Sequence, residues 1–175
     1  MTSVKTASTS LVTSFAPWRP HQRSNASDDL LSEVLKVKQF SAIHVLRQLP
    51  VNVPVAKALI LDKVQQLQPQ VVICCGMAES RHQLHLESRA VVGDRIISTS
   101  LSLEKLVKNL RKTEISQDAG RFVCNGLYYA ILNHLQSHHP AVQCLFVHVP
   151  ILTPTNKAEI VADFLVILER VLTIE

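Results

Sequence analysis

The sequence predicts an α/β fold, a three-layer αβα sandwich with a mostly parallel central sheet. Apolar β-type segments alternate with amphipathic helical segments along the chain, and the connections between them are short. Residues 71–75 (VVICC) are apolar on both faces, which is typical of a central parallel strand covered by helices on both sides. We therefore predict a single domain over residues 10–175, preceded by a loose Ser- and Thr-rich tail over residues 1–9.

The first part of the chain predicts two strands and two helices before the central strand. Residues 10–14 predict a short strand, and residues 42–46 (AIHVL) predict a second one. Ser27 is the expected cap of the first helix, and Pro54 opens the second helix, which ends at Pro69. The expected inward residues are Leu30, Leu31, Val34 and Val37 in the first helix, and Ala58, Ile60, Leu61, Val64 and Leu67 in the second.

The later elements follow the same alternation. Gly76 ends the central strand, residues 84–92 predict a further strand, and a helix is expected near residues 102–111. Another helix runs from about residue 120 to residue 137, and residues 142–148 (VQCLFVH) predict the last strand. Asn156 and Glu159 resemble a capping box before a final helix that buries Ile160, Phe164, Ile167, Leu168 and Val171.

The composition excludes several classes of protein. No apolar run reaches the ~18 residues that a membrane span needs, and the N-terminus lacks the apolar core of a signal peptide. The four cysteines form no CxxC pair, which favours reduced thiols in a cytoplasmic protein. The net charge of +4 comes from scattered residues, and the densest basic group has the spacing of a solvated helix face. Neither a nucleic acid nor a membrane is an expected partner; a homo-oligomer stays open.

Three side chains fall where an α/β sheet places its chemistry, beyond the carboxyl ends of strands. Cys124 lies in the first turns of a helix capped by Ser116 or Asp118, where the helix dipole favours a thiolate. His148 ends the last strand and is positioned as a general base and acid. Glu87 could orient its imidazole, so the three residues form a candidate catalytic triad.

The same residues also allow structural roles. A helical cysteine is more often buried filler, and a histidine at a strand end is more often structural than catalytic. Glu87 could pair with Arg81 or Arg89 at the surface. Cys74, Cys75 and Cys144 lie in apolar strands, so we expect structural roles for them.

No cofactor or metal is expected. His82 and His85 are three residues apart but lack a nearby third ligand, and the cluster of His134, His138 and His139 suits a helix end without a metal. The chain contains neither a Gly-rich phosphate loop nor a GxSxG elbow.

Four segments together resemble one family. Residues 116–125 (SQDAGRFVCN) resemble the nucleophile motif SxDAGxYxCN of the pyroglutamyl peptidase (pyrrolidone-carboxylate peptidase) family, and residues 145–150 (LFVHVP) resemble its FxHVP motif. Residues 76–90 are similar to its GxAxxR…ExxA motif, and residues 11–18 (LVTSFAPW) to its VTGFxPF segment. The motifs occur in family order, and the resemblance spans residue 10 to the C-terminus.

The resemblance implies a cysteine peptidase that removes an N-terminal pyroglutamyl residue from peptides, in a three-layer sandwich with a six- or seven-stranded sheet. Cys124 would be the nucleophile that forms an acyl-enzyme, with His148 as base and Glu87 as its partner. The Cys124 N–H would help to hold the oxyanion. Arg95, in a segment similar to the one that places an arginine there in the family, would lie near it.

The same resemblance implies the substrate contacts. Phe15 and Trp18 belong to the segment that packs on the pyrrolidone ring, and Trp18 replaces a family phenylalanine. Met77 occupies a position that often holds glutamine, and the loop after Arg95 is shorter than in the family. These departures favour a peptide or small acyl-amide substrate of altered specificity. The alternative is a non-catalytic protein that binds a small ligand or peptide on the same scaffold.

Overall fold

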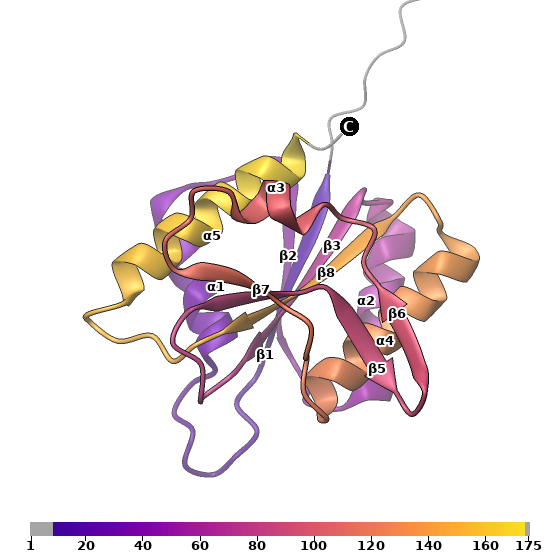
Figure 1. Cartoon of the computed structure of the whole chain (residues 1–175), viewed down its shortest axis with the longest axis horizontal. Coiled ribbons are helices and arrows are strands. Elements are labelled where there is room, and N and C mark those ends of the chain that lie inside the picture. The colour runs from indigo at the N-terminus through magenta and orange to yellow at the C-terminus, as the bar shows by residue number, and fades with distance from the viewer. Residues whose placement is uncertain (1–8, 174–175) are drawn as a thin grey trace, which may run out of the picture.

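A six-stranded sheet forms the middle layer of the structure (Figure 1). The computed structural model describes residues 9–173, so most of the tail expected over residues 1–9 lies outside the described residues. Every pairing in the sheet is parallel except that of β4 with β8, which confirms a mostly parallel sheet. Its order is β2 (Ile43–Leu49), β1 (Ser10–Phe15), β3 (Val71–Met77), β8 (Gln143–Val149), β4 (Leu84–Glu87) and β7 (Thr113–Ser116).

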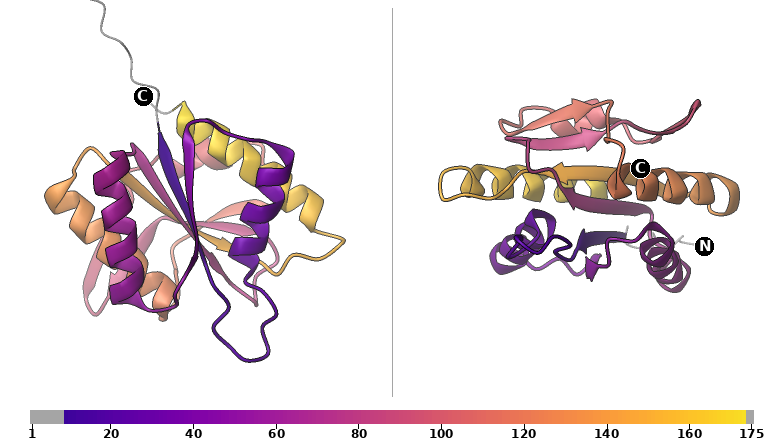
Figure 2. Two further views of the ribbon diagram at one scale, coloured as in Figure 1. Left: turned by 180° about the vertical axis from the view of Figure 1, so that it is seen from behind. Right: turned by 90° about the horizontal axis from the view of Figure 1, so that it is seen from below.

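Helices cover both faces of the sheet, which confirms the three-layer αβα sandwich. On one face lie α1 (Ala26–Val37) and α5 (Lys157–Leu172), with the short α3 (Leu103–Val107) beside them. On the other face lie α2 (Val53–Leu67) and α4 (Val123–His138). Seen along the sheet edge in Figure 2, the strands stand between these two groups. None of the helices in residues 9–173 combines the length and apolar character that a membrane span requires.

The central strand β3 is buried on both faces, as its apolar sequence predicts. Cys75 packs into the layer under α1 and α5, whereas Cys74 and Cys144 pack into the layer under α2 and α4. All three are free, fully buried thiols. Burial raises the pKa of Cys75 and of Cys144 well above the ordinary thiol value, which keeps both neutral.

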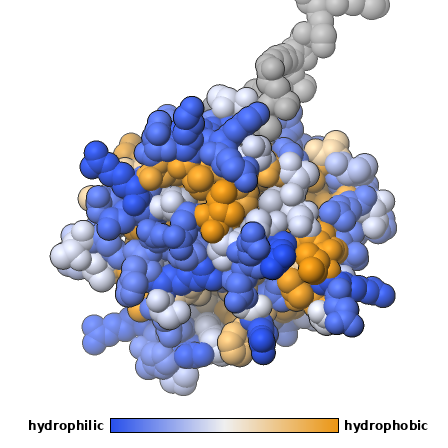
Figure 3. All heavy atoms as spheres, viewed as in Figure 1, coloured by the Kyte–Doolittle hydropathy of each residue, from blue (hydrophilic) through white to orange (hydrophobic). Residues whose placement is uncertain are grey.

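The segment expected as one strand over residues 84–92 is two strands in different sheets. The chain leaves the main sheet at Ser88, whose N–H donates to the Ser116 carbonyl (2.7 Å). It then forms an antiparallel hairpin of β5 (Arg89–Val92) and β6 (Arg95–Ser98) that lies against α4. Val91, Val92 and Ile96 are exposed on this hairpin, and Figure 3 shows an apolar area on that part of the surface.

Several helix boundaries differ from the predicted ones because other side chains take the capping positions. Asn25, not Ser27, caps α1 by accepting a hydrogen bond from the Ser27 N–H (3.1 Å). Asn52 caps α2 ahead of Pro54 by accepting from the Val55 N–H. Asn156 does occupy the cap position of α5, but its Oδ1 accepts from the Thr153 N–H (2.8 Å) and the capping box does not form.

The helix faces are mostly as predicted. All five residues expected to be buried in α5 are buried. In α1, Val37 is exposed rather than inward, because the helix ends there. In α2, Ala56 takes the buried position expected of Ala58, which is exposed. The helix expected near residues 102–111 is only the short α3, and the strand β7 after it has no counterpart in the sequence prediction.

Candidate active site

The His148 imidazole and the Glu87 carboxylate face each other across neighbouring strands. His148 lies near the end of β8 and Glu87 at the end of β4, and the two strands pair directly. His148 Nδ1 is 2.7 Å from Glu87 Oε1, and the Glu87 side chain is fully buried. When Nδ1 donates to the carboxylate, Nε2 of a neutral imidazole is an acceptor. The pair is therefore arranged as a base with its orienting carboxylate.

Cys124 is the second residue of α4 and lines the same cavity as His148. This cavity, of about 490 Å³, opens at the carboxyl ends of β3 and β8. The Cys124 thiol lies against the backbone of Gly76, which is the register partner of His148 on β3. A Cβ atom at Gly76 would lie 2.7 Å from Cys124 Sγ and 2.8 Å from Phe146 Cζ, so only glycine leaves room for the thiol in this position.

The electrostatics of Cys124 differ from the predicted helix-start thiolate. Burial raises the pKa of the Cys124 thiol to about 12, and the negative charge of Glu87 adds to the rise. The residue's own backbone N–H lowers the pKa, but by less. Desolvation thus outweighs the helix N-terminus. At neutral pH the resting thiol is protonated, and it needs a base to become a nucleophile.

Ser116 and Asp118 shape the turn before α4 and do not cap the helix. The helix begins at Val123 after Phe122, and no side chain caps it. Ser116 Oγ accepts from the Asp118 N–H (3.1 Å), and Asp118 Oδ1 accepts from the Gly120 N–H (3.0 Å). Gly120 has a φ of +80°, which glycine adopts without steric cost. This turn delivers the chain to Cys124.

Two residues just after Cys124 tie its helix to the segment that carries Glu87. The Asn125 amide pairs with the Val91 backbone in both directions, accepting from its N–H (2.9 Å) and donating to its carbonyl (2.7 Å). Tyr128 Oη donates to the Glu87 carbonyl (2.9 Å). The motif over residues 116–125 contains Asn125 without assigning it a role, and Tyr128 lies three residues beyond the motif. Because buried polar side chains are usually hydrogen-bonded, polar residues on the inward face of this apolar helix could have indicated these contacts.

Arg81 is the site residue that sequence reasoning missed. It lines the cavity, and its Nη2 lies 3.5 Å from Glu87 Oε1. The same Nη2 donates to the Asp118 carbonyl (2.7 Å) in the turn before α4. Glu87 therefore does pair with an arginine, as expected. The pair is not at the surface, because the Glu87 side chain is buried and also accepts the hydrogen bond from His148. The structural and the functional roles of Glu87 are compatible.

The predicted substrate contacts divide into two groups. Trp18 and Met77 line the cavity, and the Arg19 guanidinium lies 4.5 Å from the centre of the half-exposed Trp18 ring. Phe15, by contrast, is buried in the core under α2 and α4 and does not line the cavity. Arg95 is exposed on the β5–β6 hairpin, outside the cavity lining. Arg81, rather than Arg95, is the cation that reaches the Glu87–His148 pair.

His134, His138 and His85 make local contacts. The His134 and His138 rings stack 4.3 Å apart at the end of α4, and His138 Nδ1 lies 3.1 Å from the His134 carbonyl. His85 contacts Arg81 and Glu114. Within residues 9–173, no group of three His, Cys, Asp or Glu side chains is arranged to hold a metal ion.

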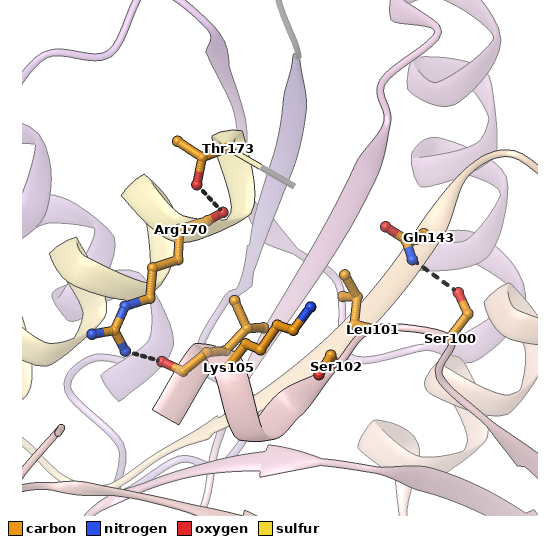
Figure 4. Close-up of a pocket in the computed structure, with 8 residues that line it drawn as sticks. Ser100, Leu101, Ser102, Lys105, Gln143, Arg170 and Thr173 are labelled. Atoms are coloured by element: carbon orange, nitrogen blue, oxygen red, sulfur yellow. Dashed lines mark hydrogen bonds between the residues drawn. The ribbon is translucent and has the colours of Figure 1, made fainter. Parts of the chain in front are cut away.

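A second cavity, of about 560 Å³, lies at the opposite end of β8 (Figure 4). Its walls include Lys105 of α3, Gln143 at the start of β8 and Arg170 of α5. Arg170 donates to the Leu106 carbonyl (2.6 Å), and Gln143 donates to Ser100 Oγ (3.2 Å). None of the predicted site residues lines this cavity, and none of its lining residues is a cysteine, histidine or carboxylate. The candidate active site is therefore the cavity at Cys124.

Comparison with protein families gives a match over the second half of the domain. The family model described as pyroglutamyl peptidase matches residues 93–163, a stretch that includes Cys124 and His148. Among curated proteins, the pyrrolidone-carboxylate peptidase of Bacillus velezensis is 26% identical over 166 residues, covering 80% of this chain and 77% of that protein. Pyrrolidone-carboxylate peptidase 2 of Photorhabdus laumondii is 28% identical over 199 aligned positions, covering 99% and 89%.

Solved structures give the same result for the fold. The crystal structure of pyroglutamyl peptidase I from Bacillus amyloliquefaciens superposes with a TM-score of 0.82 at 20% identity, covering 97% of both chains. A mutant pyrrolidone carboxyl peptidase from Pyrococcus furiosus superposes with a TM-score of 0.78 at 21% identity, covering 94% of this chain and 98% of that one. At these identities the superpositions show a shared fold.

Proposed function

We propose that the chain belongs to the pyroglutamyl peptidase family of cysteine-type omega peptidases and hydrolyses the bond after an N-terminal pyroglutamyl residue of a peptide. The observation that carries this proposal is the arrangement of Cys124, His148 and Glu87. Cys124 and His148 line one cavity, and His148 is hydrogen-bonded to the buried Glu87 carboxylate. A nucleophile, a base and an orienting group are the three parts that acyl transfer by a cysteine requires.

In the first half of the reaction, His148 Nε2 takes the proton of the Cys124 thiol as Sγ attacks the carbonyl carbon of the pyroglutamyl residue. The carbonyl oxygen becomes an oxyanion, and the Cys124 backbone N–H, which has no acceptor inside its helix, donates to it. The C–N bond then breaks as the His148 imidazolium gives its proton to the leaving amine. The product is a free peptide amine and a thioester on Cys124.

In the second half, His148 Nε2 takes a proton from a water molecule that attacks the thioester carbon. The C–S bond breaks, the Cys124 thiolate recovers the proton, and pyroglutamate leaves as the free acid. Both halves pass through a protonated imidazole next to Glu87, 2.7 Å away. A buried carboxylate stabilises this imidazolium strongly because few water molecules screen the pair.

The neutral resting thiol fits this mechanism. Since the pKa of Cys124 is raised to about 12 by burial, the thiolate does not exist in quantity before substrate binds. Proton transfer to His148 and attack on the carbonyl carbon therefore occur together. His148 is needed both to form the thioester bond and to hydrolyse it. This supports a general-base role for His148 in both halves of the reaction.

The cavity suits a small, uncharged acyl group. Its lining includes Trp18, Met77 and the apolar residues Phe122 and Val123 next to Cys124. A pyroglutamyl residue is a neutral lactam ring, and an aromatic face and a thioether can pack against such a ring. The volume of about 490 Å³ leaves room for part of the following peptide. We propose related acyl amides as further substrates, and the free thiols favour a cytoplasmic location.

The test is hydrolysis of a fluorogenic pyroglutamyl amide by the wild type and by Cys124→Ala, with Cys75→Ala as the matched control. Cys75 is a free thiol in the opposite layer of the core, so its variant reports any general effect of losing a buried cysteine. We expect turnover by the wild type and Cys75→Ala and background rates for Cys124→Ala. Equal rates for wild type and Cys124→Ala would contradict the proposal. Binding of the amide without turnover would instead support the non-catalytic alternative.

A further inference from the structure

A group of ionisable side chains continues from the Glu87–His148 pair toward the edge of the sheet. Arg81 precedes β4, His85 lies on β4 and Glu114 on β7. Arg81 Nη1 donates to His85 Nδ1, and His85 Nε2 lies 3.1 Å from Glu114 Oε1. His85 is also the direct cross-strand partner of His148. The mechanism above uses none of these three side chains.

Arg81 contacts both halves of the site. Its Nη2 lies 3.5 Å from Glu87 Oε1, the same oxygen that holds His148 Nδ1 at 2.7 Å. The other oxygen, Oε2, is buried and has no hydrogen-bond partner among the described residues. The orientation of the carboxylate therefore depends on the groups at Oε1. Because the side chain is fully buried, the nearby guanidinium also offsets the cost of burying its negative charge.

The other part of the site that Arg81 contacts is the turn that leads to Cys124. Nη2 of Arg81 donates to the Asp118 carbonyl (2.7 Å), six residues before Cys124. Arg89 Nε supports the same turn by donating to the Gln117 carbonyl (3.0 Å). One planar guanidinium thus sets the distance between the carboxylate that orients the base and the turn that positions the thiol. Such a fork geometry belongs to arginine, and a lysine ammonium cannot reproduce it.

His85 holds Arg81 only in its neutral form. Accepting from Arg81 requires Nδ1 without a proton, so the proton lies on Nε2, where Glu114 can accept it. Burial lowers the pKa of His85 and Arg81 lowers it further. Glu114 and Glu87 raise it, and His148 has the smallest, lowering effect, so the net shift is downward. Protonation of His85 removes the acceptor for Arg81 and places a second cation beside the guanidinium.

We propose that Arg81 is a positioning residue that joins the Glu87 carboxylate to the turn before Cys124, and that neutral His85 fixes the Arg81 side chain in this position. The inference rests on the proposed function for its kinetic consequences, and on geometry alone for its structural ones. Protonation then stops the reaction at two histidines for different reasons. A protonated His148 is no longer a base, and a protonated His85 releases Arg81.

The kinetic test compares His85→Gln with His82→Gln, a matched control at an exposed histidine outside the cluster. Glutamine offers an acceptor to Arg81 and a donor to Glu114 but does not titrate. In the wild type and His82→Gln we expect log kcat/KM to fall with decreasing pH at a slope greater than about one, the limit for a single protonation. In His85→Gln the acid limb becomes that of a single proton, with the rate at pH 7.5 kept within about threefold. Acid limbs that superimpose for all three proteins would overturn the proposal.

Arg81→Gln and Arg81→Lys test the positioning role. We expect Arg81→Gln to lower kcat by about a hundredfold, with a much smaller change in KM, because the ground-state contacts of the substrate stay in place. Arg81→Lys restores charge without the fork and recovers only part of kcat. An unchanged kcat in Arg81→Gln, or a loss confined to KM, would overturn the positioning role.

A measurement without turnover separates this proposal from the proposed function. ¹⁵N NMR of the imidazoles in the unliganded wild type at pH 7.5 should show His85 as the neutral Nε2–H tautomer, and Arg81→Gln should disturb that signal. An Nδ1–H tautomer or a charged His85 overturns the proposal even if pyroglutamyl amides are hydrolysed. The expected tautomer together with no hydrolysis supports the positioning geometry and counts against the proposed function.

Discussion

Gly76 and Cys124 are in direct contact, and the absence of a side chain at Gly76 is what lets the thiol reach the strand that pairs with His148. A Cβ atom at Gly76 would come within 2.7 Å of Cys124 Sγ, closer than such atoms approach in folded proteins. On its other side the same Cβ would meet the Phe146 ring, 2.8 Å away. The position of the Cys124 thiol is therefore set by packing against the sheet as much as by the helix that carries it.

Gly76→Ala tests this contact. We expect the added methyl to displace Sγ, to lower kcat by at least about tenfold and to cost about 1–3 kcal/mol of stability through overpacking. Gly126→Ala is the control, since a Cβ there meets only Val53 Cγ2 at 3.3 Å, a side-chain atom that can shift. Steady-state kinetics and urea unfolding of both variants check the prediction. A Gly76→Ala enzyme with wild-type kcat would contradict it.

Glu87→Gln tests the orienting carboxylate. An amide keeps the shape of the side chain but removes the charge that stabilises the imidazolium, and it can present an N–H to His148 Nδ1 in place of an acceptor. We expect kcat to fall by about a hundredfold or more with the fold intact. The control is Glu104→Gln, an exposed carboxylate in α3. Comparable kcat values for the two variants would show that Glu87 is only structural.

The alkylation of Cys124 should report its raised pKa. Because burial holds the pKa near 12, the rate of labelling by iodoacetamide should still be rising at pH 10 rather than levelling off near neutrality. The measurement is the pH dependence of Cys124 labelling, followed by peptide mass spectrometry. A plateau in the rate between pH 6 and 8 would mean that a thiolate–imidazolium pair already exists in the free enzyme.

Alkaline pH should destabilise the fold. Burial raises the pKa of Cys75, Cys144, Cys124 and Tyr128, so these groups stay protonated in the folded protein while the unfolded chain ionises. The contribution of the thiols is present below their unfolded pKa of about 8.5, and that of Tyr128 below its unfolded pKa of about 10; each is lost as the pH rises above that value. Urea unfolding at pH 8 and pH 10.5 measures the loss. Cys75→Ala should show a smaller decrease between the two pH values, and an unchanged wild-type stability would contradict the account.

Much of the fold follows from the sequence because long apolar patterns specify it. The doubly buried β3, the last strand β8 and the amphipathic α5 lie where the pattern of apolar residues places them. The short elements do not. β7 has four residues, too few to establish a period, and it becomes a strand only because the sheet provides a partner. β4 lies inside the strand predicted over residues 84–92, but the sequence does not reveal that this strand ends at Glu87.

The candidate site likewise has a part that the sequence predicts and a part that depends on tertiary contacts. The motifs predict Cys124, His148 and Glu87 as a triad, and the structure places the His148 imidazole against the Glu87 carboxylate. The position of Arg95 could not be predicted, because it depends on the β5–β6 hairpin turning through Gly93, with a φ of +58°, away from the cavity. The role of Arg81 depends on contacts with Asp118, 37 residues away in sequence. The pKa of Cys124 depends on its burial, which a helix-start pattern does not reveal.

We propose that Cys124 forms a covalent acyl-enzyme with the help of His148. This can be measured by acid quenching during turnover of a pyroglutamyl amide, followed by intact-mass and peptide mass spectrometry. We expect a pyroglutamyl thioester on Cys124 in the wild type and no adduct in His148→Ala. An acyl group on another residue, or turnover without any adduct on Cys124 under conditions where deacylation is slowed, would contradict it.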